Sequence, residues 1–67
     1  MPLEKRNGII TSIKLTVYKM RTNLNWYNKA CSFLANLENS LHRMDPDDFG
    51  SAVNYWQELL LPEVMKG

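Results

Sequence analysis

The sequence predicts an all-α fold, either a small three-helix bundle or a helical hairpin with an N-terminal helix, that self-associates. Three observations favour this fold class. Residues 24 to 44 carry a wide apolar stripe, residues 45 to 48 form a helix-start signal, and residues 9 to 22 repeat apolar side chains at helical spacing. The expected helices span about 9–22, 24–44 and 46–61 within a single domain of residues 9–67.

The central helix, residues 24 to 44, is the longest regular segment and should set the axis of the domain. On a helical wheel its apolar side chains share one arc of roughly 160°. The arc holds Trp26, Tyr27, Ala30, Cys31, Phe33, Leu34, Leu37, Leu41 and Met44, and only Glu38 interrupts it. A stripe this wide exceeds what one partner helix covers, so we expect two neighbouring helices.

The N-terminal part of the chain divides into two sections. Residues 1 to 8 mix charged residues with Pro2 and Gly8 without periodicity, which predicts a flexible arm. Residues 9 to 22 allow two interpretations. As a helix, they align five apolar side chains in an arc of about 100°; these are Ile9, Ile10, Ile13, Val17 and Met20. As a strand over residues 11 to 18, they alternate apolar and polar positions. We favour the helix because its pattern extends over more residues.

The third helix has the clearest start in the sequence. Asp45 can cap the first turn, Pro46 suits the first helical position, and Asp47 and Asp48 place negative charge where the helix dipole favours it. The apolar arc that follows holds Phe49, Ala52, Val53, Tyr55, Trp56, Leu59 and Leu60. Pro62 is expected to end or kink the helix, since proline has no N–H to donate to the residue four back.

Size and composition limit how the domain is stabilised. A chain of this length buries only about 60% of the surface that its unfolded form exposes. Cys31 is the only cysteine and His42 the only histidine, which argues against a disulfide framework and a structural metal. Oligomerisation or a larger partner protein remains as support. No apolar run resembles a membrane span or a signal peptide, so we expect a cytoplasmic protein without membrane association.

Charge is unevenly distributed along the chain. Residues 1 to 37 hold six basic residues and one acidic residue, a net charge of +5, whereas residues 38 to 67 hold two basic and six acidic residues, a net charge of −4. Such a chain can pair head to tail with a copy of itself or offer its basic end to an acidic partner.

A DNA-binding dimer is the alternative hypothesis. With residues 11 to 18 as a strand, the order strand, helix, helix would suit a ribbon-helix-helix repressor whose ribbon enters the major groove. The candidate nucleic-acid contacts are then Lys14, Thr16, Lys19 and Arg21. Two features count against this hypothesis. Gly50-Ser51 falls inside the third predicted helix rather than between the two helices, and the central helix is too long.

No motif for catalysis, metal binding or nucleotide binding is found in the sequence. Asp45, Asp47 and Asp48 lack the spacing of a calcium-binding loop. Cys31 and His42 are separated by about 16 Å of helical rise, too far to form a nucleophile and base. We therefore expect neither enzymatic activity nor a cofactor.

The aromatic residues give the most specific functional expectation. Seven aromatic side chains are many for so small a core, so some should lie at the surface, and Trp and Tyr are enriched in interface hot spots. The expected interface residues are Leu15, Tyr18, Trp26, Phe33, Tyr55 and Trp56. The alternative is that Trp26, Phe33 and Trp56 pack with Phe49 in the core of the monomer. The favoured function is a small non-enzymatic protein–protein interaction module, a regulator or inhibitor that occludes a larger protein such as a transcription factor or enzyme.

Overall fold

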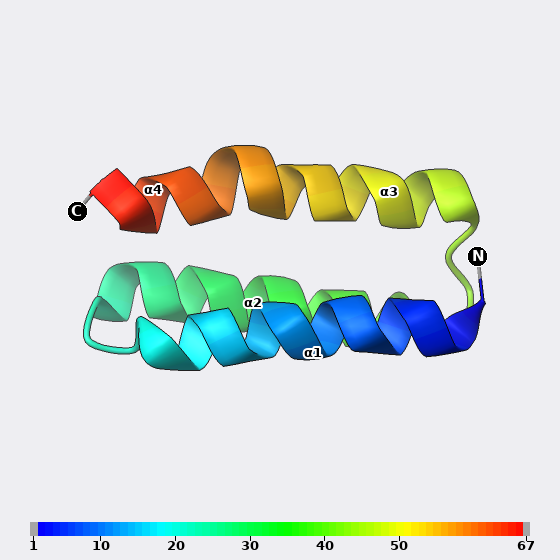
Figure 1. Ribbon diagram of the computed structural model, residues 1–67, viewed down its shortest axis with the longest axis horizontal. Helices are drawn as coiled ribbons and strands as arrows, with labels where there is room; N and C mark the ends of the chain where they lie inside the picture. The colour runs from blue at the N-terminus through cyan, green and yellow to red at the C-terminus, as the bar shows by residue number, and fades with distance from the viewer. Residues whose placement is uncertain (1, 67) are drawn as a thin grey trace.

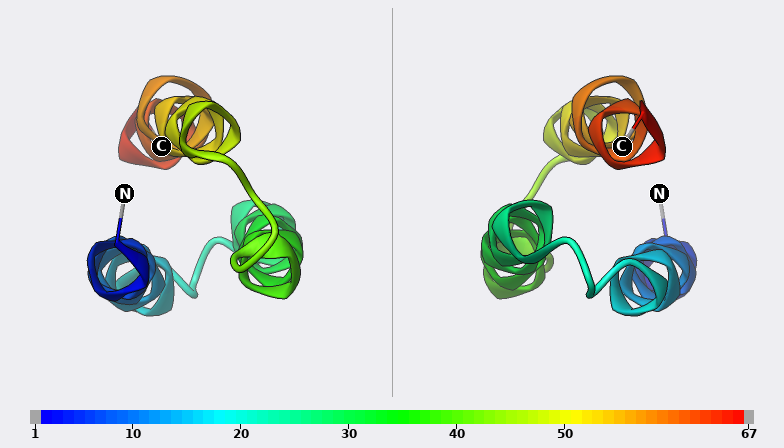
Figure 2. Two further views of the ribbon diagram at one scale, coloured as in Figure 1. Left: turned by 90° about the vertical axis from the view of Figure 1, so that its right-hand side faces the viewer. Right: turned by 90° about the vertical axis from the view of Figure 1, so that its left-hand side faces the viewer.

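Three helical segments run along one another in the computed structural model, which describes residues 2–66 (Figure 1). Helix α1 spans Leu3–Lys19 and α2 spans Leu24–Ser40. The third segment is continuous and consists of α3 (Pro46–Tyr55), the π-helical turn η1 (Trp56–Leu60) and α4 (Leu61–Lys66). Seen end on, the segments occupy the corners of a triangle (Figure 2). The predicted all-α bundle is confirmed, and residues 2–66 contain no strand.

The core lies along the axis of this triangle, and each segment contributes one apolar stripe to it. The buried apolar residues are Ile10, Ile13 and Val17 from the first segment, Trp26, Ala30, Leu34, Leu37 and Leu41 from the second, and Phe49, Trp56, Leu60 and Val64 from the third. The stripe expected on the central helix is therefore the one that packs. It contacts both neighbours because its width spans the angle between them.

Helix α1 begins earlier than the sequence suggested. Pro2 precedes its first turn, and Leu3 is already helical. The prediction of a flexible arm over residues 1 to 8 is therefore wrong for residues 3 to 8, and Met1 lies outside the described residues. The physical reason is Arg6, which occupies the core position one turn before Ile10 and is only 6% exposed. Gly8 lies within the helix with open space around it, where it weakens the helix by about 1 kcal/mol but does not break it.

Residues 11 to 18 lie entirely inside α1, so the strand interpretation of this stretch is wrong. The five apolar positions at helical spacing determine the structure because they bring Ile13 and Val17 into the core together. The antiparallel ribbon that the DNA-binding hypothesis requires is therefore not formed by these residues.

Helix α2 ends at Ser40 rather than at Met44, and its end is joined to α1 by Arg6. The Nη1 atom of Arg6 donates hydrogen bonds to the carbonyl oxygens of Leu41 at 2.9 Å and of Met44 at 2.7 Å. The guanidinium also lies 5.2 Å from the centre of the Phe49 ring. One side chain of α1 thus satisfies carbonyl groups at the end of α2 and contacts α3.

Helix α3 starts as predicted, but the third segment continues beyond residue 61. The Asp45 carboxylate accepts a hydrogen bond from the Asp48 N–H at 2.8 Å, and Pro46 occupies the first turn. The segment passes Pro62 because η1 is a wider turn, in which the Leu61 N–H donates to the Trp56 carbonyl five residues back. In a regular α-helix the Pro62 ring would collide with the Glu58 carbonyl.

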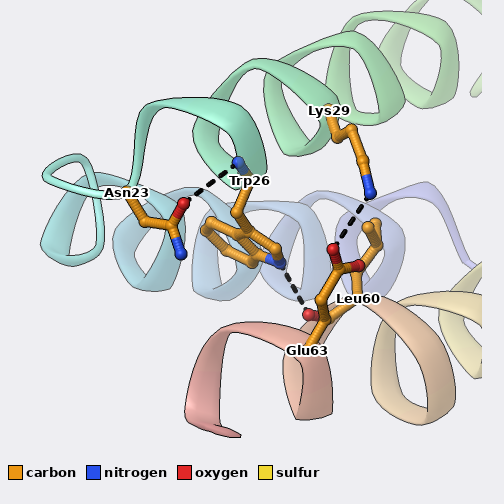
Figure 3. Close-up of polar contacts among 5 residues, drawn as sticks. All are labelled: Asn23, Trp26, Lys29, Leu60 and Glu63. Carbon is orange, nitrogen blue, oxygen red and sulfur yellow. Dashed lines mark hydrogen bonds and ion pairs between the residues drawn. The ribbon is translucent and has the colours of Figure 1, made fainter. Parts of the chain in front are cut away.

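The start of α2 is joined to the end of the third segment by Trp26 (Figure 3). Its backbone N–H is capped by the Asn23 side-chain oxygen at 3.3 Å, and its indole Nε1 donates to the Leu60 carbonyl at 2.6 Å. Leu60 belongs to η1 and is itself buried. The bundle therefore has one buried hydrogen-bonded junction at each end, formed by Arg6 and by Trp26.

Candidate functional site

An open groove with a volume of about 580 Å³ lies between α2 and the third segment. Its lining is Asn25, Asn28, Lys29, Ser32, Phe33, Asn36, Tyr55 and Leu60. Most of these residues belong to α2 and recur every three or four positions, which places them on one side of that helix. We refer to this hollow as the amide groove.

Amide side chains dominate the polar wall of the amide groove. Asn25, Asn28 and Asn36 all project from α2 and are exposed, and the side-chain hydrogen bonds within residues 2–66 involve none of their amides. Long polar side chains usually cover a solvated helix face. The helix propensity of asparagine is lower than theirs by roughly 0.5 kcal/mol per residue. These residues therefore weaken α2 while leaving donors and acceptors free at the wall.

Aromatic side chains line the rest of the amide groove, Phe33 from α2 and Tyr55 from α3. Phe33 is half-buried, and its ring centre lies 5.6 Å from that of Tyr55, which is 47% exposed. Phe33 also stacks on Trp56 at 6.5 Å, and Trp56 packs on Trp26 at 5.8 Å. A continuous series of rings thus leads from the core to the exposed edge of the groove, and the rigid core supports the surface aromatic residues.

The lining of the amide groove contains one charged side chain, and that side chain is paired. Lys29 is the only ionisable cation in its lining, and the Lys29 Nζ lies 3.0 Å from a carboxylate oxygen of Glu63 in α4 (Figure 3). Both side chains are exposed, so the pair contributes at most about 1 kcal/mol to stability. It nevertheless cancels the charge at this part of the groove and bridges its two walls.

The six expected interface residues separate into three groups. Phe33 and Tyr55 line the amide groove. Leu15 and Tyr18 are 58% and 52% exposed on α1 and lie outside it. The expectation that Trp26 and Trp56 lie at an interface is wrong, because they are only 1% and 5% exposed and belong to the core. The indole of Trp26 is stable there because its polar N–H has a buried partner.

The residues expected to contact nucleic acid do not form one surface for that purpose. Lys14 is paired with Glu38 of α2 at 3.2 Å, and the Thr16 hydroxyl donates to the Ser12 carbonyl of its own helix at 3.2 Å. Lys19 and Arg21 are exposed at and after the end of α1. One of the three cations is therefore neutralised within the molecule, and the strand that would align them is absent.

Leu15 and Tyr18 are exposed on α1, and Tyr18 lies close enough to the half-buried Tyr27 of α2 to affect its pKa. Contact with the Cys31 side chain, chiefly a hydrogen bond, raises the pKa of the Tyr27 hydroxyl above its ordinary value; Tyr18 raises it further and Arg21 opposes the rise. We call Leu15, Tyr18 and Tyr27 the hairpin face.

Two smaller hollows lie elsewhere on the surface. One of about 290 Å³ separates α1 from the third segment beside Thr16 and Gln57, and one of about 260 Å³ lies beside Arg6 and His42. Within residues 2–66 no three His, Cys, Asp or Glu side chains gather as a metal site would require, and no helix has the length and apolarity to cross a bilayer.

Comparison with known proteins leaves the family open: no family model, curated protein or solved structure matches the chain. Phe33 and Tyr55 of the amide groove are among the interface residues expected from the sequence, and its asparagines are not. The available signal was the density of a weak helix former on one side of α2.

Proposed function

We propose that this chain is a small non-enzymatic protein–protein interaction module, which acts as a regulator or inhibitor by occluding a surface of a larger protein. The observation that carries the proposal is the amount of large apolar side chain left exposed once the core is complete. The exposed residues are Leu3, Leu15, Tyr18, Leu24, Tyr55, Leu59 and Met65. Exposed apolar and aromatic groups on so small a domain are typical of recognition surfaces.

Two surfaces support the proposal, the hairpin face and the amide groove. Both contain exposed tyrosines, Tyr18 on the first and Tyr55 on the second. Tyrosine supplies a large contact area at low entropic cost together with a hydroxyl group. Cys31 is a free thiol, which accords with a reducing, cytoplasmic setting for the complex.

Self-association is the second part of the proposal. The third segment carries Asp47, Asp48 and Glu58, while Lys19 and Arg21 lie at and after the end of α1. Opposite charges on different segments allow copies to associate head to tail. Sedimentation at micromolar concentration should therefore detect a homodimer or a larger assembly, and a monomer at every concentration would refute this part.

Affinity capture from the native host, followed by mass spectrometry, tests the interaction function. The Tyr18→Ala and Tyr55→Ala variants should lose the captured partner, since truncating a hot-spot residue costs about 2 kcal/mol or more. Met65→Ala is the matched control, because Met65 is exposed but lies outside both surfaces. A module of this kind should also show weak salt dependence.

Two results would contradict the proposal. One is capture of a partner that none of the exposed apolar side chains affects. The other is duplex DNA binding that falls steeply with salt and is lost in a Lys19→Ala, Arg21→Ala variant, since that pattern is typical of phosphate contacts.

A further inference from the structure

We infer that the amide groove holds an extended segment, about five residues long, of a partner polypeptide. The inference rests on the interaction function proposed above and adds the conformation and chemistry of what is bound. Three properties of the groove lead to it: its single, paired charge, its row of free amides, and its exposed aromatic pair.

Charge selects a neutral occupant. Lys29, the one cation in the lining, is paired with Glu63 at 3.0 Å, and no other lining side chain is charged at neutral pH. A phosphate group or a strongly acidic segment would have to displace Glu63 from Lys29 and would meet no second cation in the lining. The uncharged amide groups of a polypeptide main chain are compatible with this lining.

Hydrogen-bonding chemistry selects a polypeptide main chain. Each asparagine amide offers both an N–H donor and a carbonyl acceptor, and Ser32 offers a hydroxyl that does both. An extended chain presents the complementary groups, one N–H and one C=O at each residue. Because neighbouring segments of the bundle do not use the amides of Asn28 and Asn36, these groups are available to such a chain.

The length of the asparagine row limits the number of residues in the bound segment. The row from Asn25 to Asn36 covers about 16 Å of helical rise. An extended chain advances about 3.3 Å per residue, so roughly five residues fit alongside the row. The Phe33 and Tyr55 rings contact each other with their centres 5.6 Å apart, and the exposed part of this pair provides an apolar surface for one side chain of that segment.

The groove is also held open from within the fold. The two walls are tied by the Trp26 hydrogen bond to the Leu60 carbonyl and by the Lys29–Glu63 pair. Little rearrangement is then needed on binding, which reduces the entropic cost of recognising a short segment.

Selection from a random heptapeptide library displayed on phage, with the full chain as bait, tests the inference. Enriched peptides are then synthesised and their affinity is measured for the wild type and for an Asn28→Ala, Asn36→Ala double variant. We expect the double variant to bind about tenfold more weakly, because at least two hydrogen bonds are lost. Its thermal midpoint should be unchanged or higher, since alanine is the better helix former.

An Asn39→Ala, Asn54→Ala double variant is the matched control. Both asparagines are exposed on helices and lie outside the groove lining, so peptide affinity should remain that of the wild type. A Tyr55→Ala variant should also weaken binding, and circular dichroism verifies that its fold is retained.

Three outcomes would overturn the inference: no peptide is enriched, enriched peptides bind equally well to the groove variant and the wild type, or neutral oligosaccharides on an array bind in an Asn28-dependent manner while peptides do not. These outcomes are distinguishable from failure of the interaction function. If a captured partner depends on Tyr18 but not on Asn28 and Asn36, the interaction function stands and the groove is not its site.

Discussion

Replacing Arg6 by methionine tests whether the junction between the start of α1 and the end of α2 stabilises the bundle. Methionine keeps a long flexible side chain over Phe49 but removes the guanidinium. The carbonyl groups of Leu41 and Met44 then lose the donors that now lie at 2.9 Å and 2.7 Å. The substitution thus isolates the two hydrogen bonds from the apolar packing of the same side chain.

The expected cost follows from opposing effects. Each hydrogen bond from a charged donor contributes about 1.5–3 kcal/mol, which gives roughly 3–6 kcal/mol for the pair. Removing the guanidinium also ends its desolvation cost, which is appreciable because the Nε atom is buried without a partner. The net destabilisation should be about 2–4 kcal/mol. A chain of 67 residues has roughly 3–10 kcal/mol of total stability, so the variant loses a large part of it.

Urea denaturation followed by circular dichroism measures this difference. With a slope of about 1 kcal/mol per molar urea, the midpoint should fall by roughly 2–4 M. Lys5→Met is the matched control, because Lys5 is the exposed neighbour on the same helix and its replacement should change stability by no more than about 0.5 kcal/mol. An Arg6→Met variant as stable as the wild type would refute the reasoning, because the cost of burying the charge would then cancel both hydrogen bonds.

Three further predictions concern the rest of the bundle. Trp26→Phe leaves the buried Leu60 carbonyl without its donor and should destabilise the fold by about 1–3 kcal/mol in urea denaturation; no change would mean that the 2.6 Å bond is not formed in solution. Leu37→Ala should cost about 2–4 kcal/mol, and Asp45→Ala only about 1 kcal/mol, and the opposite order would contradict the placement of the core. Gly50→Ala should raise stability by about 0.5–1 kcal/mol in thermal unfolding, since a Cβ there meets open space; destabilisation would show a hidden contact.

Sequence reasoning succeeded where a feature was local. The start of α3 was predictable because Asp45 and Pro46 act on the turn that follows them, and both do so in the structure. The apolar stripe of α2 was predictable because its period is a property of one helix. Neither inference required knowledge of what lies across the bundle.

The sequence did not predict the position of polar groups whose hydrogen-bond partners lie on another segment. Arg6 was read as part of a charged arm, because its hydrogen-bond acceptors, the carbonyls of Leu41 and Met44, lie on another segment and carry no side-chain signal. Trp26 was expected at the surface for a similar reason, since the Leu60 carbonyl that accepts from its N–H lies on another segment, in the π-helical turn before Pro62. Backbone partners of this kind are invisible in a list of side chains.

The position of the two buried junctions has a mechanical consequence for the third segment. Arg6 contacts Phe49 near the beginning of the third segment, and Trp26 donates a hydrogen bond to Leu60 near its end (Figure 1). The third segment is therefore attached to the other two helices by these junctions at two points. Side-chain packing alone restrains the span between them, which includes Tyr55. Outward bending of this span would widen the groove without unfolding either end, and amide hydrogens near Tyr55 should exchange faster than those near Phe49.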